Sequence, residues 1–318
     1  MRILPALVLA AGELLAPALA QTYPARPIRI VVPFPAGGTM DFAVRTIARE
    51  MKSFAQPIIV ENKPGGGTVL GVEAVAKAAP DGYTLVCVGN SFTVNQTLVA
   101  ALPYDTLRDF RPIGLVTSTP NVLVGNPGVS ANSLRELVDY AKANPGKLSF
   151  ASVGNGTIQH LAGETFKRMA GIDMLHVPYK GQAPAMNDLL GGQVNLMIGN
   201  LPDLLPQIRA GKLKPYGVTT SQRAALAPDL PTIAEQGYPG FETYAWFGLL
   251  APARVPDAIV SSLNGELVRV LALPEVKAAF VSRGFEPRPS TQEEFAAFLR
   301  AEIAKYARVI KDANVKLD

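Results

Sequence analysis

The chain contains little cysteine and little histidine. Cys87 is the single cysteine among 318 residues, so an intramolecular disulfide is excluded. It lies in the apolar run 83–88, where a buried and unreactive thiol is expected. The two histidines, His160 and His176, are not at metal-ligand spacing with any cysteine, and no G-x-S-x-G motif is present. The sequence therefore predicts neither a metal centre nor a serine-hydrolase triad, and both histidines are interpreted as structural.

Charge of one sign is not concentrated anywhere along the sequence. There are 30 Lys and Arg residues against 26 Asp and Glu residues, which gives a net charge of +4. No basic stripe with interleaved aromatic residues appears, and this argues against binding of nucleic acid. Hydrophobic residues make up 48% of the chain and charged residues 18%, as in ordinary globular proteins. The length is sufficient for two lobes, each with its own core.

The first twenty residues have the pattern of an export signal. Arg2 supplies the positive charge, residues 3–11 the apolar run, and residues 18–20 a small-residue cleavage site before Gln21. Glu13 weakens the apolar run. The alternative, an anchoring helix, is disfavoured because the run is too short to span a bilayer. We therefore expect a periplasmic protein, exported with a cleavable signal peptide and folded without disulfides.

Short apolar strand patterns alternate with helical patterns over most of the chain, which predicts α/β layers around largely parallel sheets. Strands are expected at 28–32, 57–61, 84–89, 122–124, 148–152, 173–177 and 194–198. Segments 117–121 and 244–256 interrupt the pattern and are interpreted as crossings between two lobes. The predicted domains are a signal peptide at 1–20, a discontinuous first lobe at 21–121 and 250–318, and a second lobe at 122–249.

Two glycine-rich turns join predicted strands to predicted helices. They are residues 32–41, Val-Pro-Phe-Pro-Ala-Gly-Gly-Thr-Met-Asp, and residues 152–157, Ser-Val-Gly-Asn-Gly-Thr. Such turns present backbone N–H groups at the positive end of a helix, where an anion is stabilised. Neither turn has a phosphate-binding lysine. The simplest interpretation is a two-lobed receptor that closes on a small carboxylate, because ligands of open α/β sheets bind at strand carboxyl ends and between lobes.

Polar residues at the strand ends are the candidate ligand contacts. Asp41 is either an N-cap or first-turn acid of the helix, or a functional group that holds the donors of the first turn in place or bonds a water under the ligand. Thr157 is expected to cap the helix of the second turn, with His160 beneath that turn. Other strand ends carry Ser91, Phe92, Tyr179, Lys180, Asn200 and Asp203. The glycine run 65–71 has the wrong spacing for a dinucleotide motif, so it is interpreted as a structural turn and no cofactor is expected.

Many short motifs occur in a fixed order along the chain. They are Tyr23-Pro24 with Arg26-Pro27-Ile28, 31–38 with Asp41, 60–65, 79–85, 102–105 with Asp109-Phe110, 145–148, Gly156-Thr157 with His160-Leu161, and 176–181. In this order and spacing the chain resembles the extracytoplasmic receptors of tripartite tricarboxylate transporters, the Bug family of periplasmic solute-binding proteins. The resemblance runs from about Tyr23 nearly to the C-terminus.

The resemblance implies a two-lobed type II periplasmic-binding-protein fold, in which each lobe is a mixed, mainly parallel sheet flanked by helices. It also implies that the two turns hold one ligand carboxylate through backbone donors and ordered water. The partners are then a small carboxylate and the membrane subunits of the transporter, with no catalytic residue, and a monomer is expected. The predicted ligand-binding residues are Phe34, Pro35, Gly38, Thr39, Asp41, Ser91, Ser152, Asn155, Gly156, Thr157, His160 and Asn200.

One departure from the family pattern bears on the ligand. After Val194 many relatives have an acid and then Phe-Asp-Asn, whereas this chain has Asn195 and then Ile198-Gly199-Asn200. Loss of an acidic group beside the cleft predicts a dicarboxylate or another organic acid without an amino group. Two alternatives stay open at this point: a receptor that signals to a sensor protein, and an exported enzyme that uses Asp41 and His160 as acid and base.

Overall fold

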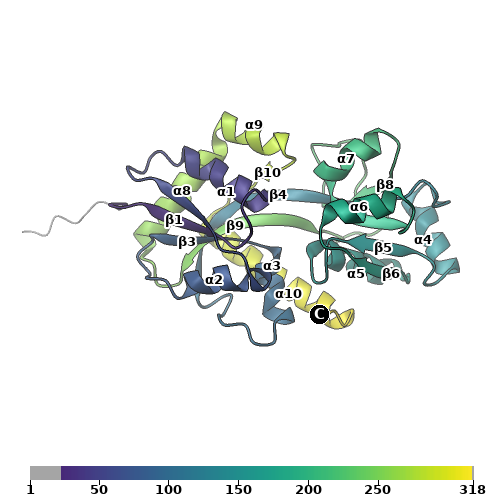
Figure 1. Cartoon of the computed structure of the whole chain (residues 1–318), viewed down its shortest axis with the longest axis horizontal. Helices are drawn as coiled ribbons and strands as arrows, with labels where there is room; N and C mark the ends of the chain where they lie inside the picture. Colours follow the sequence, from purple (N-terminus) through teal and green to yellow (C-terminus); the bar gives the residue numbers. More distant parts are fainter. Residues whose placement is uncertain (1–22, 317–318) are drawn as a thin grey trace, which may run out of the picture.

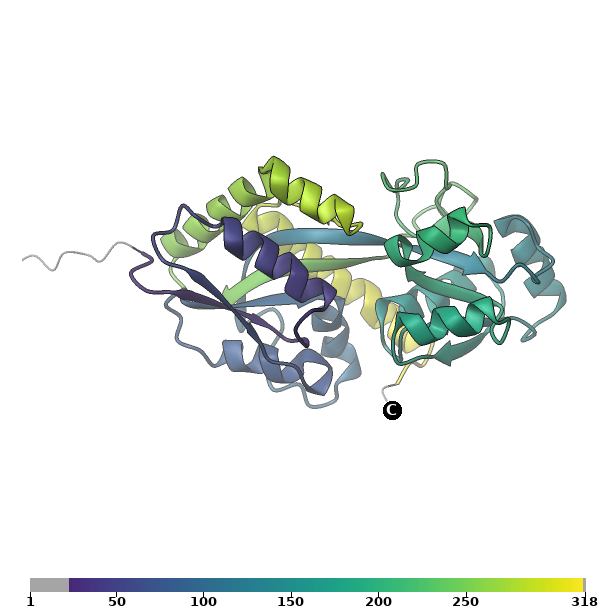
Figure 2. The same ribbon diagram turned by 45° about the horizontal axis from the view of Figure 1, so that its top comes forward.

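The structure, a computed structural model, describes residues 23–316. The predicted signal peptide lies outside these residues. Figure 1 shows two groups of helices and strands side by side along the long axis of the molecule, with β4 (Phe110–Gly125) and β9 (Tyr244–Pro252) running between them. Figure 2 shows the same arrangement from a second direction.

The first group combines N-terminal and C-terminal segments of the chain. Its elements are β1 (Ile28–Val32), α1 (Thr39–Glu50), β2 (Ile58–Asn62), the 3-10 turn η1 (Gly66–Thr68), α2 (Val69–Ala76), β3 (Thr84–Gly89), α3 (Asn90–Leu98), α8 (Asp257–Ala272), α9 (Pro274–Ser282), β10 (Glu286–Pro287) and α10 (Gln292–Asp312). The second group is built from the middle of the chain. Its elements are α4 (Leu134–Ala143), β5 (Ser149–Ser152), α5 (Ile158–Ala170), β6 (Leu175–Pro178), α6 (Gln182–Leu190), β7 (Leu196–Asn200), α7 (Leu201–Arg209) and β8 (Lys214–Val218).

The strands form one sheet in the order β2-β1-β3-β9-β4-β7-β5-β6, with β8 and β10 also paired to β4. Pairing is parallel among β1, β2 and β3 and among β5, β6 and β7. The crossing strands β4 and β9 pair antiparallel with their neighbours. Parallel pairs joined through helices place the carboxyl ends of their strands at one edge of each group, which is where both glycine turns occur.

Strand β4 shows where the sequence-based expectation was wrong. Residues 117–121 were expected to interrupt the strand pattern, but they lie inside a continuous strand of 16 residues. Pairing explains the difference, because β9 pairs with β4 as far as Pro120 and β7 pairs with it from Asn121 onward. Tertiary pairing thus overrides the weak local propensity of this segment. The residue boundaries of the two predicted lobes stay predictions.

Helix ends follow local capping chemistry. The Thr157 side chain accepts from the N–H of His160 at the start of α5, and this helix ends at Gly171 with a left-handed φ of 64°. Thr291 and Glu294 form a capping box at the start of α10. Helices α1 and α3 begin at Thr39 and Asn90, earlier than the sequence pattern indicated; α3 follows β3 directly, and α1 begins at the end of the glycine turn 33–38.

Separate hydrophobic clusters fill the two groups, and a smaller one lies between them. The smaller cluster is formed by buried side chains from α3, α5 and the end of α10: Val94, Ile158, Leu161, Tyr306, Val309, Ile310 and Val315. The C-terminal helix therefore packs against both groups, as Figure 2 also shows. Cys87 is fully buried, in agreement with the expected inert thiol, and burial raises its pKa.

Gly163 gives a stability test for the packing beneath the second turn. A Cβ at this position of α5 would lie 2.1 Å from Cε2 of the fully buried Phe150 on β5. We expect Gly163→Ala to lower the free energy of unfolding by roughly 1–3 kcal/mol, since an overpacked core forces ring and helix apart. Gly265→Ala in α8 is the matched control: its Cβ would meet nothing within 4 Å, so a gain of about 0.5–1 kcal/mol is expected. Urea denaturation of both variants measures the difference, and equal effects would contradict the packing argument.

Candidate ligand-binding site

The first turn presents open backbone at the start of α1. Gly38 is the N-cap residue and has no side-chain cap bond, and Gly37 has a left-handed φ of 82°. Residues 34–39 are exposed. Because the first N–H groups of a helix have no partner within it, this end of α1 offers donors to an anion from outside.

Asp41 holds the first turn in shape. One carboxylate oxygen, Oδ2, accepts from the N–H of Gly37 at 3.0 Å, and Nε of Arg45 donates to both carboxylate oxygens at 3.0 and 2.9 Å. Asn62, at the end of β2, donates to Asp41 Oδ1 at 2.9 Å and to the carbonyl of Phe34 at 3.1 Å. Asp41 is not the N-cap, since Gly38 is, but it lies in the first turn of α1, as the expectation of a first-turn acid predicted.

The environment of Asp41 fixes its charge. Burial raises the pKa of this carboxyl, but the hydrogen bonds from Arg45, Gly37 and Asn62 outweigh it, so the pKa lies below its usual value. Only 4% of the residue is exposed. A buried carboxylate whose oxygens are satisfied by these donors has no free proton to transfer, so its geometry suits a structural support and not an acid or base.

A third polar segment of the same group lies at the end of β3. Oγ of Ser91 is 3.2 Å from Oγ1 of Thr68, and Nδ2 of Asn95 donates to the carbonyl of Gly67 at 2.9 Å. The glycine run 65–67 thus packs against the start of α3 as a tight turn, as its structural interpretation predicted. Ser91 is half-buried and its hydroxyl is engaged there.

The second turn is held by side chains of its own helix and of two strands. The Thr157 hydroxyl donates to the carbonyl of Gly154 at 2.7 Å, and the N–H of Gly154 donates to Oγ of Ser152 at 3.2 Å. The N–H of Gly156 donates to Nδ1 of His160 at 3.1 Å. The expectations that Thr157 caps α5 and that His160 lies beneath the turn are confirmed.

His176 also belongs to this group of side chains at the second turn. No local sequence signal predicted that it lies there. Its ring stacks on that of His160, with ring centroids 3.7 Å apart and planes inclined by 7°. Nε2 of His176 lies 2.7 Å from Oγ of Ser152. Burial, then the neighbouring His176 and Lys167, lower the pKa of His160 to about 3. Burial and then Lys167 lower the pKa of His176 to about 4, so the stacked pair is neutral at neutral pH.

These bonds limit which donors a ligand can use. The N–H groups of Gly37 and Gly156 are already engaged by Asp41 and His160. These two N–H groups hold the turns in shape and are not available to a ligand. At the first turn the remaining donors are the N–H groups at the start of α1, from Gly38 onward. The two turns therefore resemble each other in construction, since each has one amide fixed by a side chain four residues later.

Side-chain amides connect the second group to the crossing strand, a link that no local sequence signal predicted. Nε2 of Gln159 donates to Oδ1 of Asn121 at 3.3 Å and to Oδ1 of Asn200 at 3.1 Å. Gln182 bonds both backbone groups of Asn200, accepting from its N–H at 3.0 Å and donating to its carbonyl at 3.3 Å. Asn200 therefore lies at the meeting point of β7, α5 and α6. Nothing in the residue spacing brings these amides together, because the contact depends on strand order.

The remaining strand-end candidates have neighbours of their own. The Tyr179 hydroxyl donates to Asp188 at 2.7 Å on α6, and Nδ2 of Asn200 donates to Asp203 at 3.4 Å. Lys180 is exposed beside the start of α6, and Phe92 is buried in the core of the first group. Asn200 is linked through Gln159 to Asn121 of the crossing strand β4, and Phe92 packs against Phe110 at the beginning of the same strand.

The position of Asn195 corrects one part of the ligand argument. Its Oδ1 accepts from the N–H of Ser149 at 2.9 Å, so it lies at the beginning of β7 and β5, at the opposite end from the glycine turns. An acid at position 195 would not border the site. At position 199 a Cβ would lie 2.9 Å from Leu204 and from Met197 and 3.2 Å from Oε1 of Gln182. Since Asn195 is remote from the turns, the expected preference for a ligand without an amino group depends on Gly199 alone.

Within residues 23–316, the structure brings no three His, Cys, Asp or Glu residues together as metal ligands. In the same range no helix has the length and apolar character needed to cross a membrane. The residues grouped at the two turns are backbone donors, amides, hydroxyls and neutral imidazoles, a set suited to hydrogen bonding an anion.

Comparison with known proteins places the chain among solute receptors. By sequence it is 39% identical over 312 residues to Protein BugT of Bordetella pertussis, covering 97% of this chain and 96% of that protein. The structure of the periplasmic binding protein BugD matches with a TM-score of 0.74 and 37% identity, covering 92% of this chain and 99% of BugD. These likenesses confirm the predicted periplasmic-binding-protein fold and the predicted Bug resemblance.

Two further solved structures contain a carboxylate. An R. palustris protein with adipate matches with a TM-score of 0.78 and 35% identity, covering 92% of this chain and 99% of that protein. MatC from Rhodopseudomonas palustris with bound malate matches with a TM-score of 0.74 and 34% identity, covering 91% of this chain and all of MatC. The model of the tripartite tricarboxylate transporter family receptors matches residues 43–315. The chain is therefore a member of the tripartite tricarboxylate transporter family of receptors.

Proposed function

We propose that the protein is a periplasmic receptor that captures a small dicarboxylate or tricarboxylate between its two groups of elements and delivers it to a tripartite tricarboxylate-type transporter. The observation that carries the proposal is the pair of glycine turns, each shaped by a side chain that fixes one amide, Asp41 for Gly37 and His160 for Gly156. Relatives with malate and adipate support the ligand class.

Binding is expected to act through closure. Each turn holds donors at a helix start, so the groups lose little freedom when an anion arrives. A ligand that contacts both turns only in the closed form stabilises that form by its differential affinity. The crossing strands β4 and β9 are the connections through which the two groups move, and the amides around Asn121 lie where β4 passes from β9 to β7. The proposed site comprises the twelve predicted ligand-binding residues, of which Asp41 and His160 act as supports.

A thermal-shift screen tests this proposal. Malate, adipate, citrate, succinate, acidic amino acids and aromatic acids are each added to the mature protein at neutral pH. A ligand present at about a hundred times its dissociation constant should add about 2.7 kcal/mol to the free energy of unfolding. Stabilisation by acidic amino acids ahead of every unsubstituted acid would contradict the preference for a ligand without an amino group.

The rival enzyme hypothesis makes a different prediction for the same screen. An enzyme would consume the compound during a long incubation, which mass spectrometry of the mixture detects. The satisfied carboxylate of Asp41 and the low pKa of His160 disfavour an acid and base pair there. Full recovery of the compound supports the receptor, and turnover would overturn it. A receptor that signals to a sensor protein would bind the same ligand. Deleting the receptor would then leave uptake of the carboxylate unchanged and abolish the transcriptional response to it.

A further inference from the structure

A cavity lies at the far end of α1 from the first glycine turn. Its volume is ≈ 550 Å³, and it is lined by the last two turns of α1, the loop 51–57 and the beginning of β2. Twelve residues separate Thr39 from Met51, which is about 18 Å along a helix. The floor of the cavity is therefore remote from the first glycine turn, although Arg45 lines the cavity and also bonds Asp41. We call it the α1–β2 cavity.

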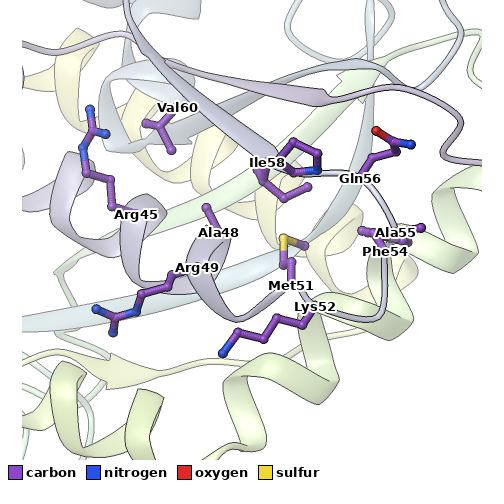
Figure 3. Close-up of a pocket in the computed structure, with 11 residues that line it drawn as sticks. Arg45, Ala48, Arg49, Met51, Lys52, Phe54, Ala55, Gln56, Ile58 and Val60 are labelled. Carbon is purple, nitrogen blue, oxygen red and sulfur yellow. The ribbon is translucent and has the colours of Figure 1, made fainter.

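The cavity has an apolar floor and a basic rim. Figure 3 shows the side chains of Ala48, Met51 and Ile58 in the middle of the group, with cationic side chains around them. The cationic residues are Arg45, Arg49 and Lys52. An apolar floor with a charged rim is the composition expected of a protein contact surface, where the floor provides burial and the rim selects the partner.

The charge that the cavity presents to solvent is positive. Arg49 and Lys52 share one carboxylate, that of Glu50, and Arg45 pairs with Asp41. The cationic side chains are 51%, 69% and 72% exposed for Arg45, Arg49 and Lys52. The carboxylates are only 6% and 11% exposed, so a partner that approaches meets guanidinium and ammonium groups first. Its complement is an acidic surface.

The edge of the sheet adjoins the cavity. Strand β2 is the last strand of the sheet on this side within the described residues, with β1 as its neighbour, and Ile59 is 51% exposed on it. An open strand edge beside an apolar floor suits a polypeptide segment, whose backbone and side chains fit both. A flat lipid surface would contact the exposed rim but not a recessed floor.

We propose that the α1–β2 cavity is the surface through which this receptor docks on its transporter, and that it binds an acidic segment on the outer face of the transporter's membrane subunits. The proposal rests on the receptor function proposed above. Docking is proposed at the C-terminal end of α1 and carboxylate capture at its N-terminal end. Binding to the transporter and binding of the carboxylate can therefore be measured separately.

The test uses a charge-neutralised variant, Arg49→Gln with Lys52→Gln. Arg45 is left in place because it also bonds Asp41. The matched control is Arg135→Gln with Lys142→Gln on α4, where Arg135 is 92% exposed and 3.8 Å from Asp139. Binding to the membrane subunits, held in phosphatidylcholine nanodiscs, is followed by biolayer interferometry, and malate binding is measured in parallel by calorimetry.

We expect the cavity variant to bind the nanodiscs at least tenfold more weakly and to lose most of the salt dependence seen with the native receptor. The control is expected to bind like the native protein, and malate affinity is expected to agree within twofold among all three. Unchanged docking of the cavity variant would overturn the proposal, as would a loss of malate affinity confined to that variant. Binding of the native receptor to phosphatidylglycerol vesicles without transporter, abolished in the cavity variant, would assign the surface to lipid and would also overturn it. Failure of the native receptor to bind any carboxylate would refute the proposed function but leave the nanodisc result readable.

Discussion

Replacing Asp41 with alanine is expected to weaken carboxylate binding at least about 100-fold, which corresponds to about 2.8 kcal/mol. The buried carboxylate is the common acceptor for Gly37, Arg45 and Asn62, and Asn62 in turn holds the carbonyl of Phe34. Without the Asp41 carboxylate, the N–H of Gly37 loses its acceptor and the first turn is no longer held in one conformation. The backbone donors at the start of α1 are then not oriented before the ligand arrives. Calorimetry with the acid identified by thermal shift measures the change.

The same variant is expected to stay folded, with a free energy of unfolding lowered by about 2 kcal/mol. The loss of stability is moderate because the Arg45 side chain is half exposed, so solvent hydrates its guanidinium group once the Asp41 carboxylate is removed. Asp139→Ala is the matched control, since Asp139 also pairs with an arginine four residues away but is 68% exposed. Its effect on stability should stay below about 0.5 kcal/mol, with unchanged affinity. Equal affinities for the Asp41 variant and the native protein would show that the turn needs no such support.

Acidification from pH 7 to pH 5 is expected to destabilise the protein through the stacked histidines. In the unfolded chain both side chains take up protons near pH 6.5, whereas in the folded protein their pKa values are about 3 and 4 for His160 and His176. The unfolded state therefore binds more protons below pH 6.5, so stability is complete above that pH and decreases as the pH falls toward 4. At pH 5 the expected loss is about 2 kcal/mol from His160 and less from the more exposed His176.

Urea denaturation at a series of pH values measures this loss, with variants that separate the two rings. His160→Gln should remove at least half of the slope between pH 7 and pH 5, and the double variant with His176→Gln should remove nearly all of it. The pKa of Asp41 lies below its usual value, so this carboxylate does not titrate in the window. An NMR titration of the folded protein in which either ring protonates near pH 6.5 would contradict the neutral pair. The ring of His160 stays neutral in the folded protein between pH 7 and pH 5 and keeps accepting from Gly156, so this ring should leave carboxylate affinity unchanged in the same window.

Local signals in the sequence were sufficient for the turns and most of the elements. Thr157 caps α5 where a threonine after a glycine turn predicts a cap, and His160 lies beneath that turn because position 160 is one helical turn further on. Strand and helix alternation likewise predicted the α/β layers, whereas the two-lobed binding-protein fold was implied by the family resemblance. Such features depend on residues within four or five positions of each other, which is the range over which backbone and side-chain preferences act.

Contacts between distant segments were not predictable in this way. His176 meets Ser152 because β5 and β6 are neighbours in register, and Asn121 meets Gln159 because β4 pairs with β7. The role of Asp41 depended in the same way on Asn62, which belongs to a different strand. Strand order decides each of these contacts, and a single sequence does not encode strand order in its local pattern.

The continuity of β4 has a consequence for how the molecule is made. Its first part bonds to β9 and its last part to β7 and β8, so the cut between residues 121 and 122 that would divide the chain passes through one hydrogen-bonded ladder. Each half, if produced alone, would carry an unpaired strand end that favours aggregation. The C-terminal helix adds a second tie, because it belongs to the first group and packs against α5 of the second. Each half on its own would lose both ties, so neither half is expected to fold as an independent unit.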